Sequence, residues 1–103
     1  MSTTQTLTER QRRHLRALAH ALKPVVRLGA AGLSEAVVRD TERALADHEL
    51  IKVKATAADA AARATLLAGL AERTGSALVH RIGHCAVLYR ARDDVPRIVI
   101  PGH

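Results

Sequence analysis

The residues best suited to chemistry in this sequence form the loop Gly29-Ala30-Ala31-Gly32. Glycine has no Cβ, so its backbone can approach a ligand closely and can adopt a positive φ. Ser34 is a preferred N-cap residue, so we expect a helix to begin just after the loop, with its free N–H groups and positive dipole end facing it. This arrangement can bind phosphate without recognising a base. An ordinary strand-to-helix turn has the same spacing, so both interpretations stay open at this point.

Positive charge is the second candidate feature. The 103 residues include sixteen Lys and Arg against ten Asp and Glu, for a formal charge of +6. Most of the cations are Arg, whose planar guanidinium can donate two parallel hydrogen bonds to one phosphate. A GC-rich genome would also favour Arg, but it would not explain the net charge. If the first two strands pair, several segments offer cations around the loop, which favours a nucleic-acid surface. The residues assigned to it besides the loop are Arg12, Arg13, Arg16, Lys23, Arg27, Lys52 and Lys54.

The shortage of aromatic residues indicates the kind of nucleic acid. The chain has no Trp or Phe, and Tyr89 is its one aromatic residue. RNA-recognition motifs and OB-folds read single strands by stacking bases on aromatic side chains. We therefore expect recognition of structured RNA by shape and backbone. The sequence leaves open whether Tyr89 stacks on a base or packs in the core.

Catalytic and metal sites have less support. His14 and His20 lie six residues apart, which is not a ligand spacing on one helix face. His84 and Cys85 are adjacent, so on a strand their side chains would point to opposite faces, and a buried Cys85 is the simpler interpretation. We expect no enzyme activity, cofactor or metal, although turnover of RNA would reveal a nuclease or modifying enzyme. The remaining candidates, each explained by a surface or turn position, are His48, His80, His103, Asp93 and Asp94.

Hydrophobic periodicity and end signals predict one α/β domain in the order α-β-α-β-α-β-β, with a mixed sheet packed with helices. Thr8 and Gln11 form a capping box, Gly75 is placed for a left-handed helix end, and Gly83-His84 suits a type II′ hairpin turn. Ile51, Val53 and Ala55 alternate with Lys52, Lys54 and Thr56, which indicates a half-buried strand. The first predicted helix begins at Thr8 and is stopped by Lys23-Pro24, and its apolar stripe is Leu15, Leu18, Ala19 and Leu22. The other predicted elements are strand Val25–Leu28, helix Ser34–His48, strand Leu50–Thr56, a helix from near Asp59 to Thr74, strands Ala77–Ile82 and Cys85–Arg90, turn Arg92–Pro96 and edge strand Arg97–Pro101.

Domain limits and location follow from the same features. We expect a flexible N-terminus over residues 1–6, the domain over 7–100 and a tail over 101–103. Cys85 is the only cysteine, so an intramolecular disulfide is excluded. The apolar runs are too short to span a bilayer, and the start lacks the layout of a signal peptide. We expect a cytoplasmic monomer without a membrane partner.

Three stretches carry a resemblance to a known family. They are Leu18 to Leu33 with its Lys23-Pro24 and glycine loop, His48 to Lys54 with Lys52-Val53-Lys54, and Ile82 to Arg90. Together they resemble the YhbY-type CRM domain (chloroplast RNA splicing and ribosome maturation), over about residues 7–100.

The resemblance implies a fold similar to the C-terminal domain of bacterial translation initiation factor three, with a four-stranded mixed sheet. It implies binding of precursor ribosomal RNA within a pre-ribosomal particle during assembly of the large subunit. In the family, the loop matched by Gly29 and Gly32 is compared with the GXXG loop of KH domains. His84 is also assigned to the RNA surface, but it is a departure, because relatives usually carry Lys in this turn, and a mostly neutral His would weaken an RNA contact there. A protein-interaction module with a basic face for an acidic ribosome-associated partner is the alternative.

Overall fold

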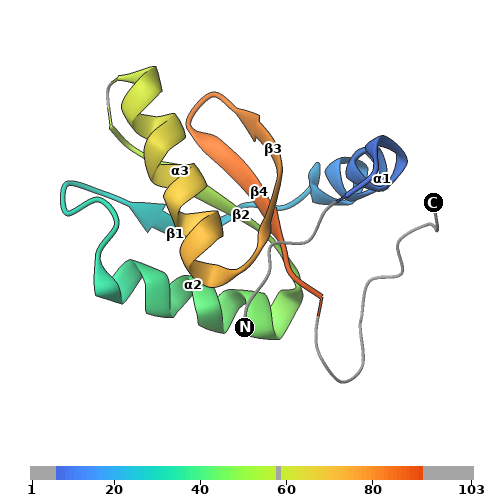
Figure 1. Ribbon diagram of the computed structural model, residues 1–103, viewed down its shortest axis with the longest axis horizontal. Coiled ribbons are helices and arrows are strands. Elements are labelled where there is room, and N and C mark those ends of the chain that lie inside the picture. The colour runs from blue at the N-terminus through green and yellow to red at the C-terminus, as the bar shows by residue number, and fades with distance from the viewer. Residues whose placement is uncertain (1–6, 58, 92–103) are drawn as a thin grey trace.

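The computed structural model describes residues 7–57 and 59–91, which form three helices and a four-stranded sheet (Figure 1). The element order α-β-α-β-α-β-β and the mixed sheet are those predicted from the sequence. The predicted turn Arg92–Pro96 and edge strand Arg97–Pro101 lie outside the described residues. The elements are α1 (Glu9–Ala19), β1 (Pro24–Leu28), α2 (Glu35–His48), β2 (Leu50–Ala55), α3 (Ala60–Thr74), β3 (Ala77–Ile82) and β4 (Cys85–Tyr89).

The sheet has the strand order β1-β2-β4-β3. β1 runs parallel to β2, with α2 as the crossover, whereas β4 runs antiparallel to both β2 and β3. Gly83, in the turn between β3 and β4, has a φ of 57°. Among the described residues Glu49 is the only non-glycine with a positive φ, so His84 does not share that region. Positive φ at the first central residue alone is the pattern of the predicted type II′ turn.

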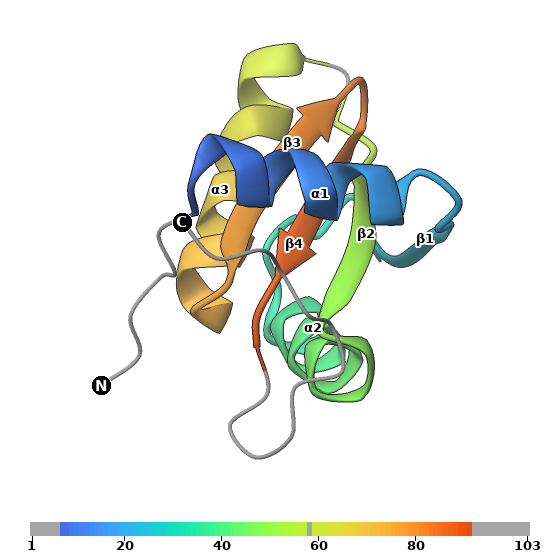
Figure 2. The same cartoon turned by 90° about the vertical axis from the view of Figure 1, so that its right-hand side faces the viewer.

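Each face of the sheet has its own core. α2 and α3 cover one face, where Ile51, Val53 and Ala55 are buried as the alternation in β2 predicts. α1 crosses the strands on the opposite face (Figure 2), where Leu15 and Ala19 pack with strand residues. The strand residues of this second core are Leu50, Ala77, Val79, Val87 and Tyr89.

Local sequence signals define most helix ends. Thr8 and Gln11 form both bonds of the predicted capping box at the start of α1. Ser34 caps α2 and Asp59 caps α3 with their side chains. Gly75 ends α3 in the left-handed conformation, with φ 63° and ψ 31°. These three helix starts and one helix end are therefore encoded within a few residues of the boundary.

The first helix is shorter than the sequence predicts. It ends at Ala19 rather than at Lys23, and its last bonds close over only three residues. The chain leaves the helix here because Pro24 already belongs to β1 and pairs with β2, so residues 20–23 become the connection. The predicted apolar stripe is accordingly divided, with Leu15 and Ala19 buried but Leu18 and Leu22 exposed.

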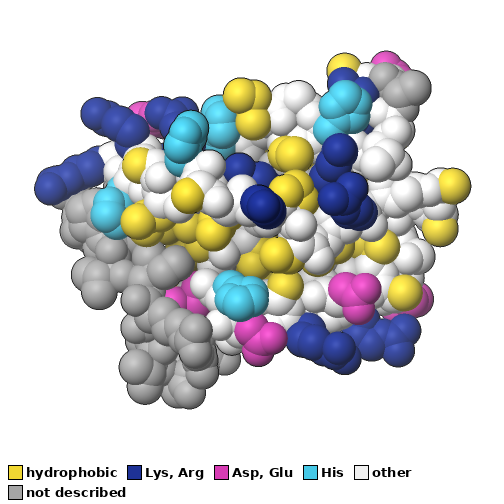
Figure 3. All heavy atoms as spheres, turned by 180° about the vertical axis from the view of Figure 1, so that it is seen from behind, with side chains coloured by type: hydrophobic (Ala, Val, Ile, Leu, Met, Phe, Trp, Pro, Cys, Tyr) yellow, Lys and Arg dark blue, Asp and Glu magenta, His cyan; other side chains and the backbone are white. Residues whose placement is uncertain are grey.

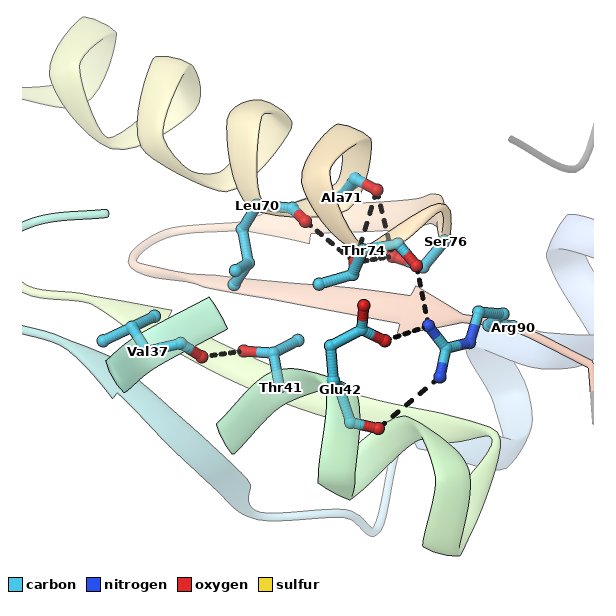
Figure 4. A network of polar contacts seen from close by, with 8 residues as sticks. All are labelled: Val37, Thr41, Glu42, Leu70, Ala71, Thr74, Ser76 and Arg90. Carbon is cyan, nitrogen blue, oxygen red and sulfur yellow. Dashed lines mark hydrogen bonds and ion pairs between the residues drawn. The ribbon is translucent and has the colours of Figure 1, made fainter. Parts of the chain in front are cut away.

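Arg90, just beyond β4, joins the sheet to both helices of the other layer (Figure 4). Its guanidinium donates to the carboxylate of Glu42 in α2 and, at 2.8 Å, to the carbonyl oxygen of Thr74 in α3. The Thr74 and Ser76 hydroxyls contact each other at 2.9 Å within the same buried end of α3. Arg90 belongs to the third stretch of the family resemblance, and its contacts give it a structural role.

Candidate nucleic-acid interface

The glycine loop extends from the end of β1 and returns into α2 (Figure 1). The Gly32 amide donates to the carbonyl oxygen of Gly29 at 2.9 Å, which closes the loop as a β-turn. Gly32 then has a φ of 64°, which L side chains rarely adopt. At Gly29 a Cβ would meet no atom of the described residues within 4 Å. Gly32 therefore permits the backbone conformation of the turn, whereas Gly29 leaves space beside its own backbone.

Neighbouring elements fix the loop at both ends. Before it, the carbonyl oxygen of Leu28 accepts from the amide and the hydroxyl of Thr56, at 3.0 and 3.1 Å. After it, Leu33 packs against the core beside Gly69 of α3. A Cβ on Gly69 would lie 3.1 Å from Leu33 Cδ2, so glycine allows α3 to approach the loop closely. The loop is thus supported by β2 and α3 as well as by its own turn.

Backbone amides are what the loop can offer to an anion. Within residues 7–57 and 59–91, no group accepts a hydrogen bond from the N–H of Ala30 or Ala31, and both residues are exposed. The start of α2 offers less than the sequence predicts. Ser34 already caps it, and Glu35 places a carboxylate in its first turn, paired with Arg73 at 2.9 Å. The Glu35 carboxylate already interacts with the positive end of the helix dipole and would repel a second anion there, so the loop itself is the better anion site.

The turn that carries His84 lies at the same end of the sheet as the glycine loop. The carbonyl oxygen of His84 accepts from the amide of Ala55 at 2.8 Å, and the next amide, that of Thr56, donates to Leu28. These bonds connect the ends of β1 and β2 to the β3–β4 turn. His84 is exposed there. The structure therefore places the loop and the His84 turn along one edge.

Three of the predicted cations lie on the sheet face next to this edge. Arg27 of β1 pairs with Lys54 of β2, and Lys52 lies two residues earlier on the same face of β2. This pairing fulfils the condition set by the sequence, that the first two strands be neighbours. Lys23 is exposed immediately before β1. Lys23 lies at the other end of β1, so the loop, the His84 turn, Arg27 and Lys54 form one continuous end of the domain.

The cations of α1 divide into two kinds. Arg13 and Arg16 are exposed. Arg12 is half-buried, and its Nη1 group donates to the carbonyl oxygens of Leu78 at 2.7 Å and Val79 at 2.9 Å. Arg12 therefore attaches α1 to β3, a role that its position among other arginines does not reveal. Because α1 packs on the sheet end away from the loop, its cations extend the basic face rather than surround the loop.

Charge is strongly segregated between the two layers. Seen from behind, Lys, Arg and His side chains spread from α1 across the sheet, while most acidic side chains lie along the margin, beside a second group of Lys and Arg (Figure 3). The elements account for this difference. α1 and the four strands contain Arg10, Arg12, Arg13, Arg16, Arg27, Lys52, Lys54 and Arg81 against Glu9, whereas α2 and α3 contain Arg39, Arg43, Arg63 and Arg73 against Glu35, Asp40, Glu42, Asp47 and Glu72.

Sequence reasoning missed Arg81, which is exposed beside the His84 turn. Its nearness to Gly83-His84 was the available signal. The face it occupies depends on an irregularity in β3, where the pairing with β4 shifts between Leu78 and His80. The register after the shift pairs Arg81 with Ala86, which belongs to the core beneath α2 and α3, so Arg81 lies on that face and not on the face beneath α1.

Tyr89 and Cys85 resolve two questions that the sequence left open. Tyr89 is 2% exposed within the core beneath α1, and burial, followed by the nearby Glu49 carboxylate, raises the pKa of its hydroxyl. It packs inside and presents no stacking surface. Cys85, expected to be buried, is half-buried instead, because the core beneath α1 ends at Val87 and does not reach it.

The described residues contain no group of three or more His, Cys, Asp and Glu side chains placed to hold a metal ion. In that same part of the chain, no helix has the length and apolar character needed to cross a membrane.

Comparison with known proteins identifies the class to which this fold and surface belong. Residues 7–90 match the model of the CRS1 / YhbY (CRM) domain. A protein named RNA-binding protein from Haemophilus influenzae is 43% identical over 96 residues, which are 93% of this chain and 96% of that protein. A probable RNA-binding protein from Pseudomonas aeruginosa is 44% identical over 84 residues, covering 82% and 81% of the two chains.

A solved structure agrees with these matches. The solution structure of a Staphylococcus aureus protein, described as a candidate RNA-binding protein, has a TM-score of 0.81 and 34% identity. The likeness covers 93% of this chain and all of that one. The chain therefore belongs to the CRS1/YhbY (CRM) domain family, as the three stretches of its sequence predict.

Proposed function

We propose that this chain is a non-enzymatic RNA-binding protein that binds structured RNA through the glycine loop and the basic layer formed by α1 and the sheet. The segregation of charge carries the proposal, because α1 and the sheet face beneath it have seven Lys and Arg and one acidic residue. A polyanion is the partner that such a face attracts. The RNA-binding names of the family relatives support the same conclusion.

The basic layer would supply most of the affinity, and the loop would fix the position of one phosphate. Each phosphate neutralised by a cation releases counterions, which makes binding depend on salt. If six cations make such contacts, the logarithm of the binding constant should fall against the logarithm of the salt concentration with a slope of about −4 to −5. The buried Tyr89 leaves shape and backbone as the main means of recognition.

The family resemblance extends this proposal to a particular RNA and compartment. The expected ligand is precursor large-subunit ribosomal RNA, bound in the cytoplasm within a particle that is still being assembled. Crosslinking the protein to RNA in cells and sequencing the attached fragments tests this assignment. Enrichment of large-subunit precursor sequences would support it, whereas scattered messenger RNA fragments would contradict it.

Substitution at Gly29 tests the loop. Gly29→Asp adds a negative charge where a Cβ meets no atom of the described residues within 4 Å, so the fold should tolerate it while phosphate is repelled. We expect ribosomal RNA affinity in a filter-binding assay to fall on the order of tenfold, which corresponds to about 1.4 kcal/mol. Gly29→Asn is the matched control of nearly the same size without the charge. If Gly29→Asp binds as well as the parent, the loop does not contact phosphate.

The alternative, a basic face for an acidic protein partner, makes a different prediction. A complex with a protein should survive an excess of bulk RNA. RNA held by the basic layer should be displaced by bulk RNA and by salt. A pull-down with and without added ribosomal RNA therefore separates the two functions.

A further inference from the structure

Among the described residues, one part of the basic layer lies outside both hydrophobic cores. The face beneath α1 is divided into cross-strand rows, and Leu50, Tyr89 and Ala77 form a buried row. Two steps nearer the loop edge, the register aligns Lys54 with Cys85 and Cys85 with Ile82, and β1 adds Arg27. We name Arg27–Lys54–Cys85–Ile82 the open row.

The open row is accessible along its whole length. Arg27 is exposed and Lys54 and Cys85 are half-buried. Ile82 is 66% exposed, the highest value among the exposed large hydrophobic residues of the described chain. A single exposed aliphatic residue needs no explanation by itself. Here it continues a row of two cations and a thiol beside the glycine loop.

The chemistry of the row matches a nucleic-acid strand better than a protein surface. Four strands about 4.8 Å apart make the row about 14 Å long, enough for a short stretch of RNA backbone. Arg27 and Lys54 offer two cations for phosphates, and Cys85 and Ile82 offer apolar contact for the sugars and base edges between those phosphates. The four strands contain no acidic residue that would repel the strand.

We propose that the open row is a second RNA contact, in which Arg27 and Lys54 bind phosphates and Cys85 and Ile82 pack against riboses or bases of the same strand. This inference rests on the proposed RNA-binding function and goes beyond the glycine loop. It assigns an apolar contact to a protein that has no exposed aromatic side chain in the described residues.

Cys85 provides a direct measurement, because it is the only cysteine in the chain. The rate of its alkylation by N-ethylmaleimide reports whether the row is covered. With a large-subunit ribosomal RNA transcript at ten times its Kd, alkylation should slow about tenfold, since only the unbound fraction reacts. Cys85→Ser confirms that the label is on this thiol.

Two substitutions separate the halves of the row by their dependence on salt. Ile82→Ala should weaken binding roughly threefold by removing apolar contact, with an unchanged salt slope because no charge is lost. Lys54→Ala should weaken binding and also make the slope shallower by about 0.7 to 1 unit. Arg43→Ala, on the exposed side of α2, is the matched control and should change neither quantity.

The outcomes distinguish this inference from the function on which it rests. If the parent binds the transcript but Cys85 reacts at its free rate and Ile82→Ala binds normally, the open row is not an RNA contact, although RNA binding stands. If the parent does not bind the transcript at all, both proposals fail. Protection of Cys85 together with the unchanged salt slope of Ile82→Ala supports the proposal.

Discussion

Arg12 offers the sharpest test of the division between structural and RNA-binding cations. Its Nη1 group donates to the carbonyl oxygens of Leu78 and Val79, at 2.7 and 2.9 Å, and so holds α1 against β3. A hydrogen bond that involves a charged group contributes roughly 1.5–3 kcal/mol. Because Arg12 is only half-buried, water can replace part of each bond, and we expect Arg12→Ala to lower the free energy of unfolding by about 2–3 kcal/mol.

A loss of this size is large for a small domain, whose total stability is about 5–15 kcal/mol. At roughly 4–8 °C per kcal/mol, it should lower Tm by about 10–20 °C. Urea unfolding at 25 °C, followed by circular dichroism, measures the free energy directly. Arg13→Ala is the control, because Arg13 is exposed on the same helix, and its stability should stay within about 0.5 kcal/mol of the parent.

In the RNA-binding assay the order of the two variants should be reversed, with the larger loss for Arg13→Ala than for Arg12→Ala. Arg13→Ala removes an exposed cation, so it should reduce ribosomal RNA affinity and make the salt dependence shallower. Equal urea midpoints for Arg12→Ala and Arg13→Ala would refute the argument, because the two bonds to β3 would then contribute nothing to stability. A charge reversal that includes Arg12 would confuse unfolding with lost binding, so tests of α1 as an RNA contact should use Arg13 and Arg16.

Two further predictions concern backbone geometry and pH. Gly32→Ala places an L residue at φ 64° and should cost roughly 1–2 kcal/mol in urea unfolding, whereas Gly29→Ala should leave the unfolding midpoint unchanged. Because the folded state raises the pKa of Tyr89 above its usual 10.0, its contribution to stability is present below pH 10 and is lost as the pH rises above it, when the unfolded chain ionises first. Urea unfolding between pH 8 and 11 should therefore show a steeper loss for the parent than for Tyr89→Phe, and parallel curves would contradict this.

The elements of the fold were largely predictable because their signals are local. The capping box at Thr8, the alternation in β2 and the left-handed Gly75 each act within a few residues, and the structure confirms them. The end of α1 was not predictable in the same way. It depends on where β1 must pair with β2, which is a contact between segments far apart in the sequence.

The candidate site was predictable in outline and not in detail. The loop and the pairing of Arg27 with Lys54 follow from spacing and one assumption about strand order. The structural role of Arg12 could not be found, because its acceptors lie 66 and 67 residues away at an irregular point of β3. The exposure of Cys85 depends on how far α1 extends over the sheet, which no local pattern encodes.

In the proposed complex with RNA, the loop and the open row need each other for a physical reason. The loop has no cation of its own, and a neutral amide hydrogen bond contributes only about 1 kcal/mol in water, so its amides alone could not hold RNA. Arg27 and Lys54 can supply affinity, but long flexible side chains do not fix where a phosphate lies. Because the Leu28–Thr56 bonds tie the loop to the end of β2, close to Lys54, position and charge come from one rigid edge. Specific placement of structured RNA then requires no exposed aromatic residue.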